Sequence, residues 1–314
     1  MPSAPCTFTL VTDPEQVLRL VEPLVATDPE ALSVLASVTR SLVVDPGRHL
    51  EPRWWVGTDA SGQVVAAAMH TPPHQVHIAL ATPDQARTLA AGLADLAGSA
   101  GLAGRADLAG RADLPGVGGL RAPAEAFADE WTARTGASAT VAMEVGRFGL
   151  PTRPRVPFAV AGRYRVAEPG DMAVVDAWHQ QFVDAVEGGG RRAGALTEHL
   201  ADGRIGLWED DGRLVSMAYA SPASGGVTRI SGVWTPPALR GHGYASALVA
   251  ALSRARQDAG EACMLYTDLA NPTSNAIYRA IGYRRVGDSI SIAFNAATGS
   301  MPPGGGSAQD ATGT

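Results

Sequence analysis

The feature that most constrains the fold is a segment in the middle of the chain, residues 149–162, with the sequence GLPTRPRVPFAVAG. Its prolines and arginines follow neither a helical nor a strand period, which is typical of a linker. A chain of 314 residues normally forms more than one domain. We therefore expect a domain over 1–148, a linker over 149–162 and a second domain over 163–296. Residues 297–314 are rich in Gly, Ser and Pro and are expected to form a disordered tail.

Both parts show the same plan of helices and strands. Helical spacing is found over 12–40, 84–98, 123–135, 171–186, 193–202, 243–259 and 272–281. Strand patterns are found over 54–56, 63–69, 76–80, 139–148, 164–166, 205–209, 213–220, 227–235, 262–268 and 284–294. Consecutive hairpins followed by a strand–helix–strand crossover predict an α/β fold of the α+β type. Each domain would be a mixed, mostly antiparallel sheet flanked by helices. A hexapeptide, AGRADL, occurs twice over 103–114, which is too short for a solenoid and is assigned no function.

Hydrophobic content and net charge exclude several classes of protein. Hydrophobic residues make up 46% of it, enough for buried cores, and its formal charge of -6 argues against nucleic acid or an anionic membrane as partner. No apolar run approaches the roughly 20 residues that span a bilayer, and no secretion signal is evident. We expect a cytoplasmic protein, in which Cys6 and Cys263 stay reduced. Abundant Ala, Gly and Arg with almost no Lys indicate a GC-rich bacterial genome.

A glycine-rich turn, Arg240–Ala245, lies between a strand pattern and a helix pattern. Pro236 and Pro237 end the strand, because proline cannot donate a ladder hydrogen bond. Gly241 and Gly243 let the backbone approach a ligand closely. The free N–H groups and the positive end of the helix dipole favour an anion there. Arg240 adds a guanidinium, so the turn is predicted to hold a phosphate.

Two familiar phosphate motifs do not fit this turn. A Walker A loop requires a Lys-Ser/Thr pair after the glycines, and none follows. The dinucleotide fingerprint requires a third glycine where Ser246 stands, and the two prolines separate the strand from the turn. A plain glycine-rich connection and some other nucleotide site stay open.

A second motif opens the helix predicted over 272–281. Asn271 followed by Pro272 is typical of a helix start, and Gly282 is typical of its end. At 100° per residue, Asn271, Asn275 and Tyr278 fall within a stripe of about 60°. The opposite side should pack on the sheet; it holds Ala276, Ile277, Ala280 and Ile281. The polar stripe would then face an edge or cleft, unless Asn271 is only a cap and Tyr278 only a boundary aromatic.

Together the two motifs resemble those of the GNAT superfamily of N-acetyltransferases over about residues 163–295. The family's Arg/Gln-x-x-Gly-x-Gly/Ala turn is met by Arg240, Gly243 and Ala245, and its Asn…Tyr-x-x-x-Gly-Phe/Tyr pattern is met through Tyr278, Gly282 and Tyr283. The resemblance implies two tandem GNAT-like domains and acetyl-CoA as co-substrate, with no metal. The cofactor-binding residues that it implies are Val233, Thr235, Arg240, Gly241, His242, Gly243, Tyr244, Ala245, Asn271, Asn275 and Tyr278.

In the family, the turn holds the pyrophosphate of coenzyme A, and the preceding strand polarises the thioester carbonyl through backbone N–H groups. The tyrosine protonates the departing thiolate, so Tyr278 is the catalytic residue that the resemblance implies. A phenol of pKa near 10 suits a thiol of pKa near 8.5, since the transfer costs little. The amine must also lose a proton. Because the strand over 227–235 has no acidic residue, the candidate bases are Glu187, His179 and Glu198, or a water relay. A solvated helix face is the alternative for each of the three side chains.

The N-terminal part departs from the pattern. After the strand over 76–80 the sequence is ATPDQAR, without a glycine turn, and no Asn…Tyr helix follows. We expect this half to be degenerate, to have lost cofactor binding and to shape the substrate cleft. His70, His74 and His77 invite a metal site, but no carboxylate or cysteine stands nearby, so a surface hairpin is the interpretation.

These observations predict an N-acetyltransferase that acts on a primary amine of a small molecule or peptide. The amine would attack the thioester directly in a ternary complex. The alternative is a non-catalytic coenzyme A-binding regulatory or interaction module. The protein is expected to be a monomer or homodimer.

Overall fold

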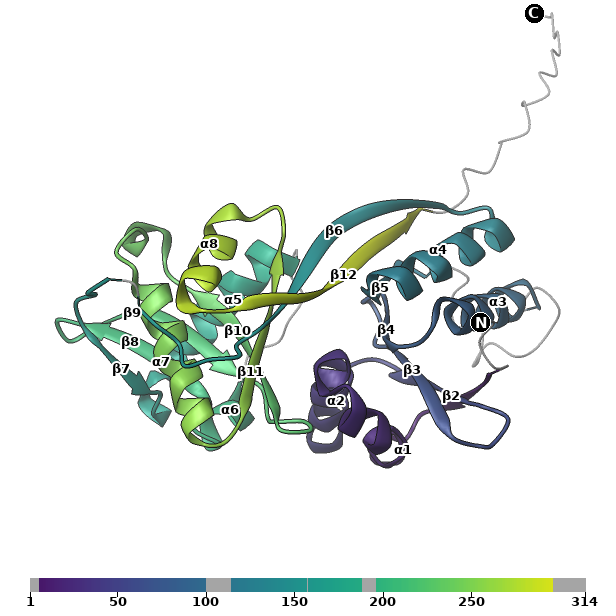
Figure 1. Ribbon diagram of the computed structural model, residues 1–314, viewed down its shortest axis with the longest axis horizontal. Coiled ribbons are helices and arrows are strands. Elements are labelled where there is room, and N and C mark those ends of the chain that lie inside the picture. Colours follow the sequence, from purple (N-terminus) through teal and green to yellow (C-terminus); the bar gives the residue numbers. More distant parts are fainter. Residues whose placement is uncertain (1–5, 100–113, 157, 188–195, 296–314) are drawn as a thin grey trace, which may run out of the picture.

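The structure is a computed structural model that describes residues 6–99, 114–156, 158–187 and 196–295. It has two lobes connected by two long strands (Figure 1). The helices are α1 Pro14–Thr27, α2 Pro29–Val44, α3 Pro83–Ser99, α4 Arg121–Thr135, α5 Met172–Glu187, α6 Thr197–Ala201, α7 Tyr244–Asp258 and α8 Pro272–Ile281, with short 3-10 turns at Pro169–Asp171 and Pro237–Leu239. The strands are β1 Thr7–Val11, β2 Arg53–Thr58, β3 Val64–His70, β4 Val76–Leu80, β5 Gly116–Leu120, β6 Ser138–Gly149, β7 Arg163–Val166, β8 Ile205–Asp210, β9 Arg213–Ala220, β10 Val227–Trp234, β11 Ala262–Asp268 and β12 Arg284–Asn295.

The two halves have the same order of elements. In each, one strand is followed by two helices, three strands, a helix, a strand, a helix and a last strand. The fold is therefore α/β with a large mixed sheet flanked by helices, built from two copies of one plan. This confirms the predicted fold class and the tandem arrangement.

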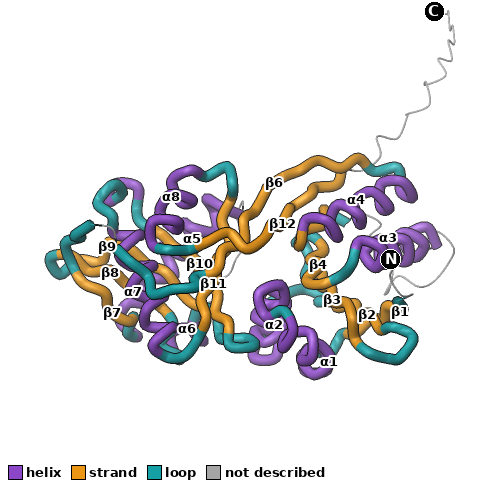
Figure 2. The backbone as a smooth tube through the Cα atoms, in the orientation of Figure 1, coloured by secondary structure: helices purple, strands orange, loops and turns teal. Residues whose placement is uncertain are grey.

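The last strand of each half is inserted into the other half. The described sheet has the order β1-β2-β3-β4-β5-β12-β6-β11-β10-β9-β8-β7. The C-terminal end of β6 pairs with β11, and the C-terminal end of β12 pairs with β5. On their other edges β6 and β12 pair with each other along their whole length. The sheet is therefore continuous through both lobes (Figure 2).

Apolar cores lie on both faces of the sheet. In the N-terminal lobe, α1 and α2 pack on one face with Trp54, while α3 and α4 pack on the other with Trp55. Neighbouring strand residues point to opposite faces, so this tryptophan pair serves both cores. In the C-terminal lobe, α7 and α8 cover one face and α5 and α6 the other. Helix α2 also packs against β10 of the other lobe.

Three local predictions need correction. The helical pattern over 12–40 forms two helices, because Pro29 starts a new helix whose first turn is capped by Asp28, which accepts a hydrogen bond from the N–H of Ala31 at 2.9 Å. Strand β1 was not among the predicted strands, and it pairs with β2. Strand β5 has the sequence GVGGL, a composition that does not indicate a strand.

Some predictions fall partly or wholly outside the described residues. These are the AGRADL repeat, apart from its last residue, the first part of the helix over 193–202, and the tail over 297–314.

The segment predicted as a linker begins in β6 and then runs against the C-terminal lobe. The N–H of Leu150 donates to the carbonyl of Cys263, and that of Arg155 to the carbonyl of Ile281, each at 2.9 Å. The domain boundaries stay a prediction.

Two further observations concern the chain as a whole. Among the described helices, none combines the length and apolar character needed to cross a membrane. Cys6 and Cys263 are both free, and Cys263 is buried.

Candidate functional site

Strands β10 and β11 diverge in the middle of the C-terminal lobe. They are parallel and pair only where Val227–Arg229 faces Ala262–Met264. Beyond this point β10 pairs with β9 on its other side, and β11 pairs with β6. Within the described residues, the edge of β10 that faces β11 therefore has no ladder partner after Arg229. Its backbone N–H and C=O groups are available to an extended ligand, as at any free strand edge.

A β-bulge shapes this edge. The register between β9 and β10 shifts between Ser231 and Trp234, and Gly232 lies there at a φ of 59°. A Cβ atom at Gly232 would lie 1.9 Å from the ring of Tyr219, so only glycine fits. Gly232 was not predicted to be part of the site, although an isolated glycine within a strand is a recognised signal of a bulge.

The predicted contacts Val233 and Thr235 follow the bulge. Val233 is half-buried and packs against the core of this lobe. The hydroxyl of Thr235 lies 2.9 Å from the hydroxyl of Ser216 on β9. Both residues thus occupy the part of the chain where β10 has left β11.

The glycine turn leads directly into α7. Gly241 has a φ of 88° and Gly243 a φ of 81°, and Gly243 is the residue that precedes the helix. Among the residues that the structure describes, no side chain caps α7. By contrast, α1, α2 and α8 are capped by the side chains of Asp13, Asp28 and Asn271. The first N–H groups of α7 are thus left for an outside acceptor, which is the arrangement expected of an anion site.

The side chains of the turn differ in what they can offer. Arg240 is exposed, donates from Nε to the carbonyl of Thr235 at 3.0 Å and lies 5.2 Å above the ring of Trp234. His242 is exposed and stacks on Tyr244. The hydroxyl of Tyr244 is engaged with a carboxylate oxygen of Asp210 at 2.6 Å, so Tyr244 can offer only its backbone. Gly241 has open space where a side chain would be.

Helix α8 has the predicted bounds, and Ile277 and Ile281 pack on the core as predicted, but the rest of the predicted face differs. Ala276 and Ala280, expected to pack on the sheet, are exposed, whereas Asn275 is only 5% exposed. The Asn275 amide donates to the carbonyls of Asp268 and Leu269 at 3.0 and 3.2 Å. These bonds hold the turn between β11 and α8, and they turn Asn275 inward. The side chain of Asn271 caps the helix by accepting from the N–H of Ser274 at 3.0 Å.

Tyr278 lies beside the same core as Val233. The residue is half-buried, and its ring meets Tyr283 edge-on with centroids 6.1 Å apart. Burial raises the pKa of Tyr278 to about 12. Within the described residues its hydroxyl makes no hydrogen bond. It is therefore a protonated phenol throughout the physiological pH range.

The candidate bases lie on α5 and α6, which cover one face of the C-terminal sheet. His179 is buried with its ring 5.6 Å from that of Tyr219, and Glu187 ends α5. Glu198 lines a cavity of about 260 Å³ between the lobes. His199, which sequence analysis missed, lines the same cavity, and burial lowers its pKa to about 4.

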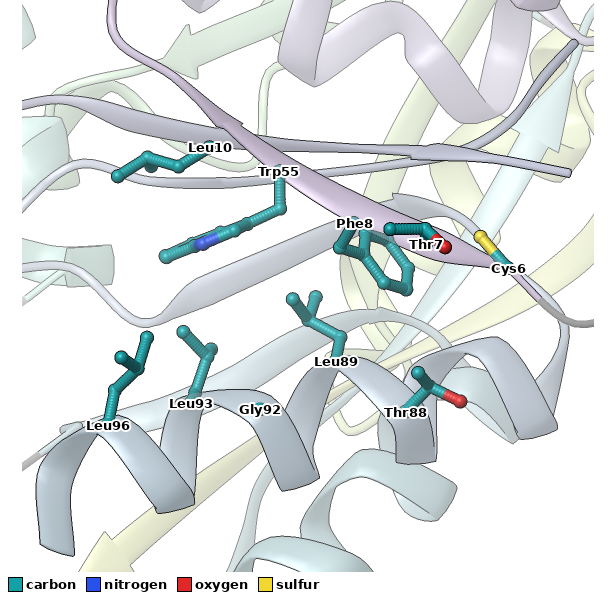
Figure 3. A pocket seen from close by; sticks show the side chains of 10 residues that line it. All are labelled: Cys6, Thr7, Phe8, Leu10, Trp55, Thr88, Leu89, Gly92, Leu93 and Leu96. Carbon is teal, nitrogen blue, oxygen red and sulfur yellow. The ribbon is translucent and has the colours of Figure 1, made fainter. Parts of the chain in front are cut away.

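A second cavity of about 350 Å³ lies within the N-terminal lobe, between β1, β2 and α3 (Figure 3). Phe8, Trp55, Leu89 and Leu93 line it together with Thr88 and Cys6, and none of its lining residues is charged at neutral pH. It offers neither a phosphate site nor an acid–base pair.

The N-terminal lobe fills the position that corresponds to the glycine turn. The hydroxyl of Thr82 accepts from the N–H of Gln85 at 3.3 Å, and the side-chain oxygen of Gln85 accepts from the N–H of Thr82 at 2.8 Å. This capping box satisfies the start of α3 internally. The helix that corresponds to α8, α4, begins directly after β5 at Arg121. The loss of cofactor binding in this half stays a prediction.

The three histidines do not form a surface hairpin as interpreted. His70 is buried and His77 half-buried, and burial lowers the pKa of each to about 4; only His74 is exposed. No group of three or more metal-ligating side chains is found among the described residues.

Comparison with known sequences gives one family match. Residues 172–283, from the start of α5 to the residue after α8 and Gly282, match the model of the acetyltransferase (GNAT) family. The glycine turn and Tyr278 lie within the matched range. Comparison with curated proteins found no match.

Solved structures show the same fold over both lobes. A GCN5-related N-acetyltransferase from Sphaerobacter thermophilus superposes with a TM-score of 0.58 at 16% identity, covering 92% of this chain and 96% of that one. A GNAT-family acetyltransferase from Colwellia psychrerythraea gives 0.53 at 10% identity, covering 92% and 98%. A tandem GNAT protein from the clavulanic acid biosynthesis pathway gives 0.53 at 14% identity, covering 95% and 100%. At these identities the similarity establishes the fold.

Proposed function

We propose that this chain, in which residues 172–283 match the model of the acetyltransferase (GNAT) family, transfers the acetyl group of acetyl-CoA to a primary amine. The amine would belong to a small molecule or peptide. The observation that carries the proposal is the unpaired edge of β10 leading into the uncapped start of α7. The two features follow each other along the chain, and each suits one part of a long, phosphorylated thioester.

The residues fit coenzyme A in two places. The N–H groups at the start of α7, the open space at Gly241 and the exposed guanidinium of Arg240 suit its pyrophosphate. The backbone around Val233 and Thr235 suits its extended pantetheine arm, which has amides that can bond to a strand edge. In this role the side chains of Asn271 and Asn275 support the site by shaping α8 and do not touch the ligand.

The proposed reaction is a direct transfer. The amine nitrogen forms a bond to the thioester carbonyl carbon while a backbone N–H of β10 donates to the carbonyl oxygen. The carbon–sulfur bond then breaks, and the sulfur takes the proton of the Tyr278 hydroxyl. The amide product loses its extra proton to water or to a nearby base, and Tyr278 regains a proton from solvent.

Calorimetric titration with coenzyme A tests the phosphate site. Arg240→Glu should weaken binding by at least about tenfold, since it replaces a charge-assisted contact with repulsion. Arg254→Glu is the matched control, because Arg254 is exposed further along α7 and should leave binding unchanged. Equal binding by both variants would contradict the assignment of the turn. Competition by NAD or ATP as strong as that by coenzyme A would indicate a nucleotide site instead.

Thiol release in the presence of an amine panel tests catalysis separately. Release that depends on an amine supports the enzyme. Tight coenzyme A binding without release from any amine would favour the alternative, a non-catalytic coenzyme A-binding module.

A further inference from the structure

The cavity of about 260 Å³ has walls from both lobes. Helix α2 and the loop after it supply one side, and α6, β9 and β10 supply the other. Figure 1 shows α2 beside the C-terminal lobe, and α2 is in contact with β10. The cavity therefore lies on the face of the C-terminal sheet that α5 and α6 cover, opposite α7.

Cationic side chains dominate the lining. In the described part of the chain, the charged lining residues are Arg40, Arg48 and Arg229 against one carboxylate, Glu198. Arg40 reaches from α2 to the other lobe, donating to the carbonyl of Ala223 at 3.0 Å and to the hydroxyl of Ser224 at 3.4 Å.

Arg229 reaches in the opposite direction, from β10 to the hydroxyls of Ser33 and Ser37 at 3.4 and 3.1 Å. The two arginines are thus held in place by bonds across the lobes, so the positive lining is part of the fold.

The cavity reaches the diverging strands. Arg229, the last residue of β10 that pairs with β11, lines it, and so does Ser231. Tyr219 lines it as well, and its ring occupies the space that a side chain at Gly232 would need. Val233 follows Ser231 along β10 by two residues, across the β-bulge at Gly232. A small molecule in the cavity can therefore extend from the arginines to the proposed reaction centre.

We propose that the acceptor is a small primary amine that also carries a carboxylate or phosphate, with its anionic group bound by Arg40, Arg48 and Arg229 and its amine directed along β10 toward Val233. This inference rests on the proposed acetyl transfer and narrows its substrate class. Guanidinium groups bind both anions through paired, charge-assisted hydrogen bonds. A polyamine would meet repulsion from the same lining.

The positive lining also helps the chemistry. Arg48 and Arg229 add to burial in lowering the pKa of His199, which shows the sign of the potential in the cavity. The same potential lowers the pKa of an ammonium group bound there, so a larger fraction of the amine is neutral and nucleophilic. A site of this kind needs only a weak base, which agrees with the absence of an acidic residue on β10.

Matched pairs of amines test the proposal in the complete protein with saturating acetyl-CoA. The pairs are alanine with ethylamine, 5-aminovalerate with butylamine, and phosphoethanolamine with ethanolamine, so that each pair differs by one anionic group. We expect kcat/KM at least tenfold higher for the anionic member of at least one pair. A preference within the first two pairs indicates a site for a carboxylate, and a preference within the third pair indicates a site for a phosphate.

Variants locate the effect. Arg48→Gln and Arg229→Gln should each reduce the preference for the anionic member several-fold, whereas Arg213→Gln, on an exposed residue at the far end of β9, should leave it unchanged. Thermal unfolding of each variant shows whether the substitution has destabilised the fold. Arg48→Gln carries the smaller risk of this, because Arg48 lies in a loop. A preference that all three variants retain would overturn the assignment of the cavity.

The outcomes separate the two proposals. Equal or better turnover of the neutral members overturns this inference and leaves acetyl transfer intact. If no amine is turned over, acetyl transfer fails. Calorimetric titration of the coenzyme A-saturated protein with 5-aminovalerate and with phosphoethanolamine then tests whether the cavity binds an anionic amine. Binding weakened by Arg48→Gln supports that site, and no binding overturns it.

Discussion

Tyr278 is the side chain on which the proposed chemistry depends most. Tyr278→Phe removes the hydroxyl and keeps the ring, so kcat should fall by about 10²-fold or more while the affinity for acetyl-CoA changes little. Steady-state kinetics and calorimetry measure the two effects. Tyr283→Phe is the matched control, since it removes a hydroxyl from the adjacent ring, where it is bonded to Ser253 at 2.8 Å within the core. An unchanged kcat in Tyr278→Phe would remove this residue from the mechanism.

The pKa of Tyr278 predicts the pH dependence of that step. A general acid must carry its proton, and burial raises the pKa of Tyr278 to about 12. Ionisation of Tyr278 would therefore lower kcat only as the pH approaches about 12. The profile of kcat against pH should therefore show no fall due to Tyr278 between about pH 8 and pH 10, around the pKa of an unburied phenol. A fall there that Tyr278→Phe abolishes would contradict this.

Gly232 gives a second prediction at the same scale. Gly232→Ala should lower the free energy of unfolding by about 1–2 kcal/mol for the left-handed backbone and by about 1–3 kcal/mol more for the collision with Tyr219. Gly226→Ala has a similar φ of 77° with open space around it, so only the first cost applies. Urea unfolding of the two variants measures the difference. Equal destabilisation would mean that the ring of Tyr219 moves aside freely.

Residues of the candidate site differ in whether their conformation depends on local or on distant contacts. The conformations of Gly241 and Gly243 depend on the local backbone, so the turn could be predicted. The direction of Asn275 depends on two carbonyls that face it only after β11 and α8 meet. The helical period alone does not include them, so Asn275 was predicted on the exposed side, and Ala276 and Ala280 on the buried side, whereas the reverse is found.

At the scale of elements, helix α2 belongs to the N-terminal lobe but forms a wall of the cavity proposed to bind the acceptor. Asp28→Ala should lower stability by about 1 kcal/mol, because it removes the cap of α2. Since α2 forms a wall of the cavity, the KM for the acceptor should rise while coenzyme A binding is unchanged. Asp13→Ala removes the cap of α1, none of whose residues lines the cavity, and provides the control. A similar rise in KM in both variants would point to a general loss of stability.

Elements that depend on distant contacts were the ones missed. Strand β4, strand β11 and helix α8 were predicted with their observed bounds because their patterns are local. Strand β5 exists because its glycines admit close neighbours: a Cβ atom at Gly119 would lie 2.1 Å from the carbonyl oxygen of Ile78. Close approach of this kind is a property of the pair of strands, and no single segment predicts it.

At the scale of the whole molecule, the exchanged strands predict that the C-terminal half does not fold alone. A fragment over 163–296 lacks β6, which leaves the edge of β11 without its partner. We expect this fragment to aggregate or to lack cooperative unfolding. Co-expression of 1–162 with 163–314 should restore a folded complex, because each fragment then supplies the strand that the other needs. Circular dichroism and size-exclusion chromatography measure both outcomes, and a stable, monomeric 163–296 would contradict the prediction.

The tandem plan could be predicted from the repeated order of elements, but the exchange could not. The pairing of β6 with β11 and of β12 with β5 joins segments more than a hundred residues apart. The cavity arises in the same way, since Arg40 and Arg229 come from different lobes.

The exchange of β6 and β12 also bears on how such a chain can change over evolutionary time. A duplicated half that has lost its ligand site is ordinarily free to be deleted. Here the half without the glycine turn supplies an interior strand of the other half's sheet. Natural selection on the half with the glycine turn therefore preserves the fold of the other half while leaving the start of α3 free to mutate. The capping box at Thr82 and Gln85 is the kind of replacement that this freedom permits.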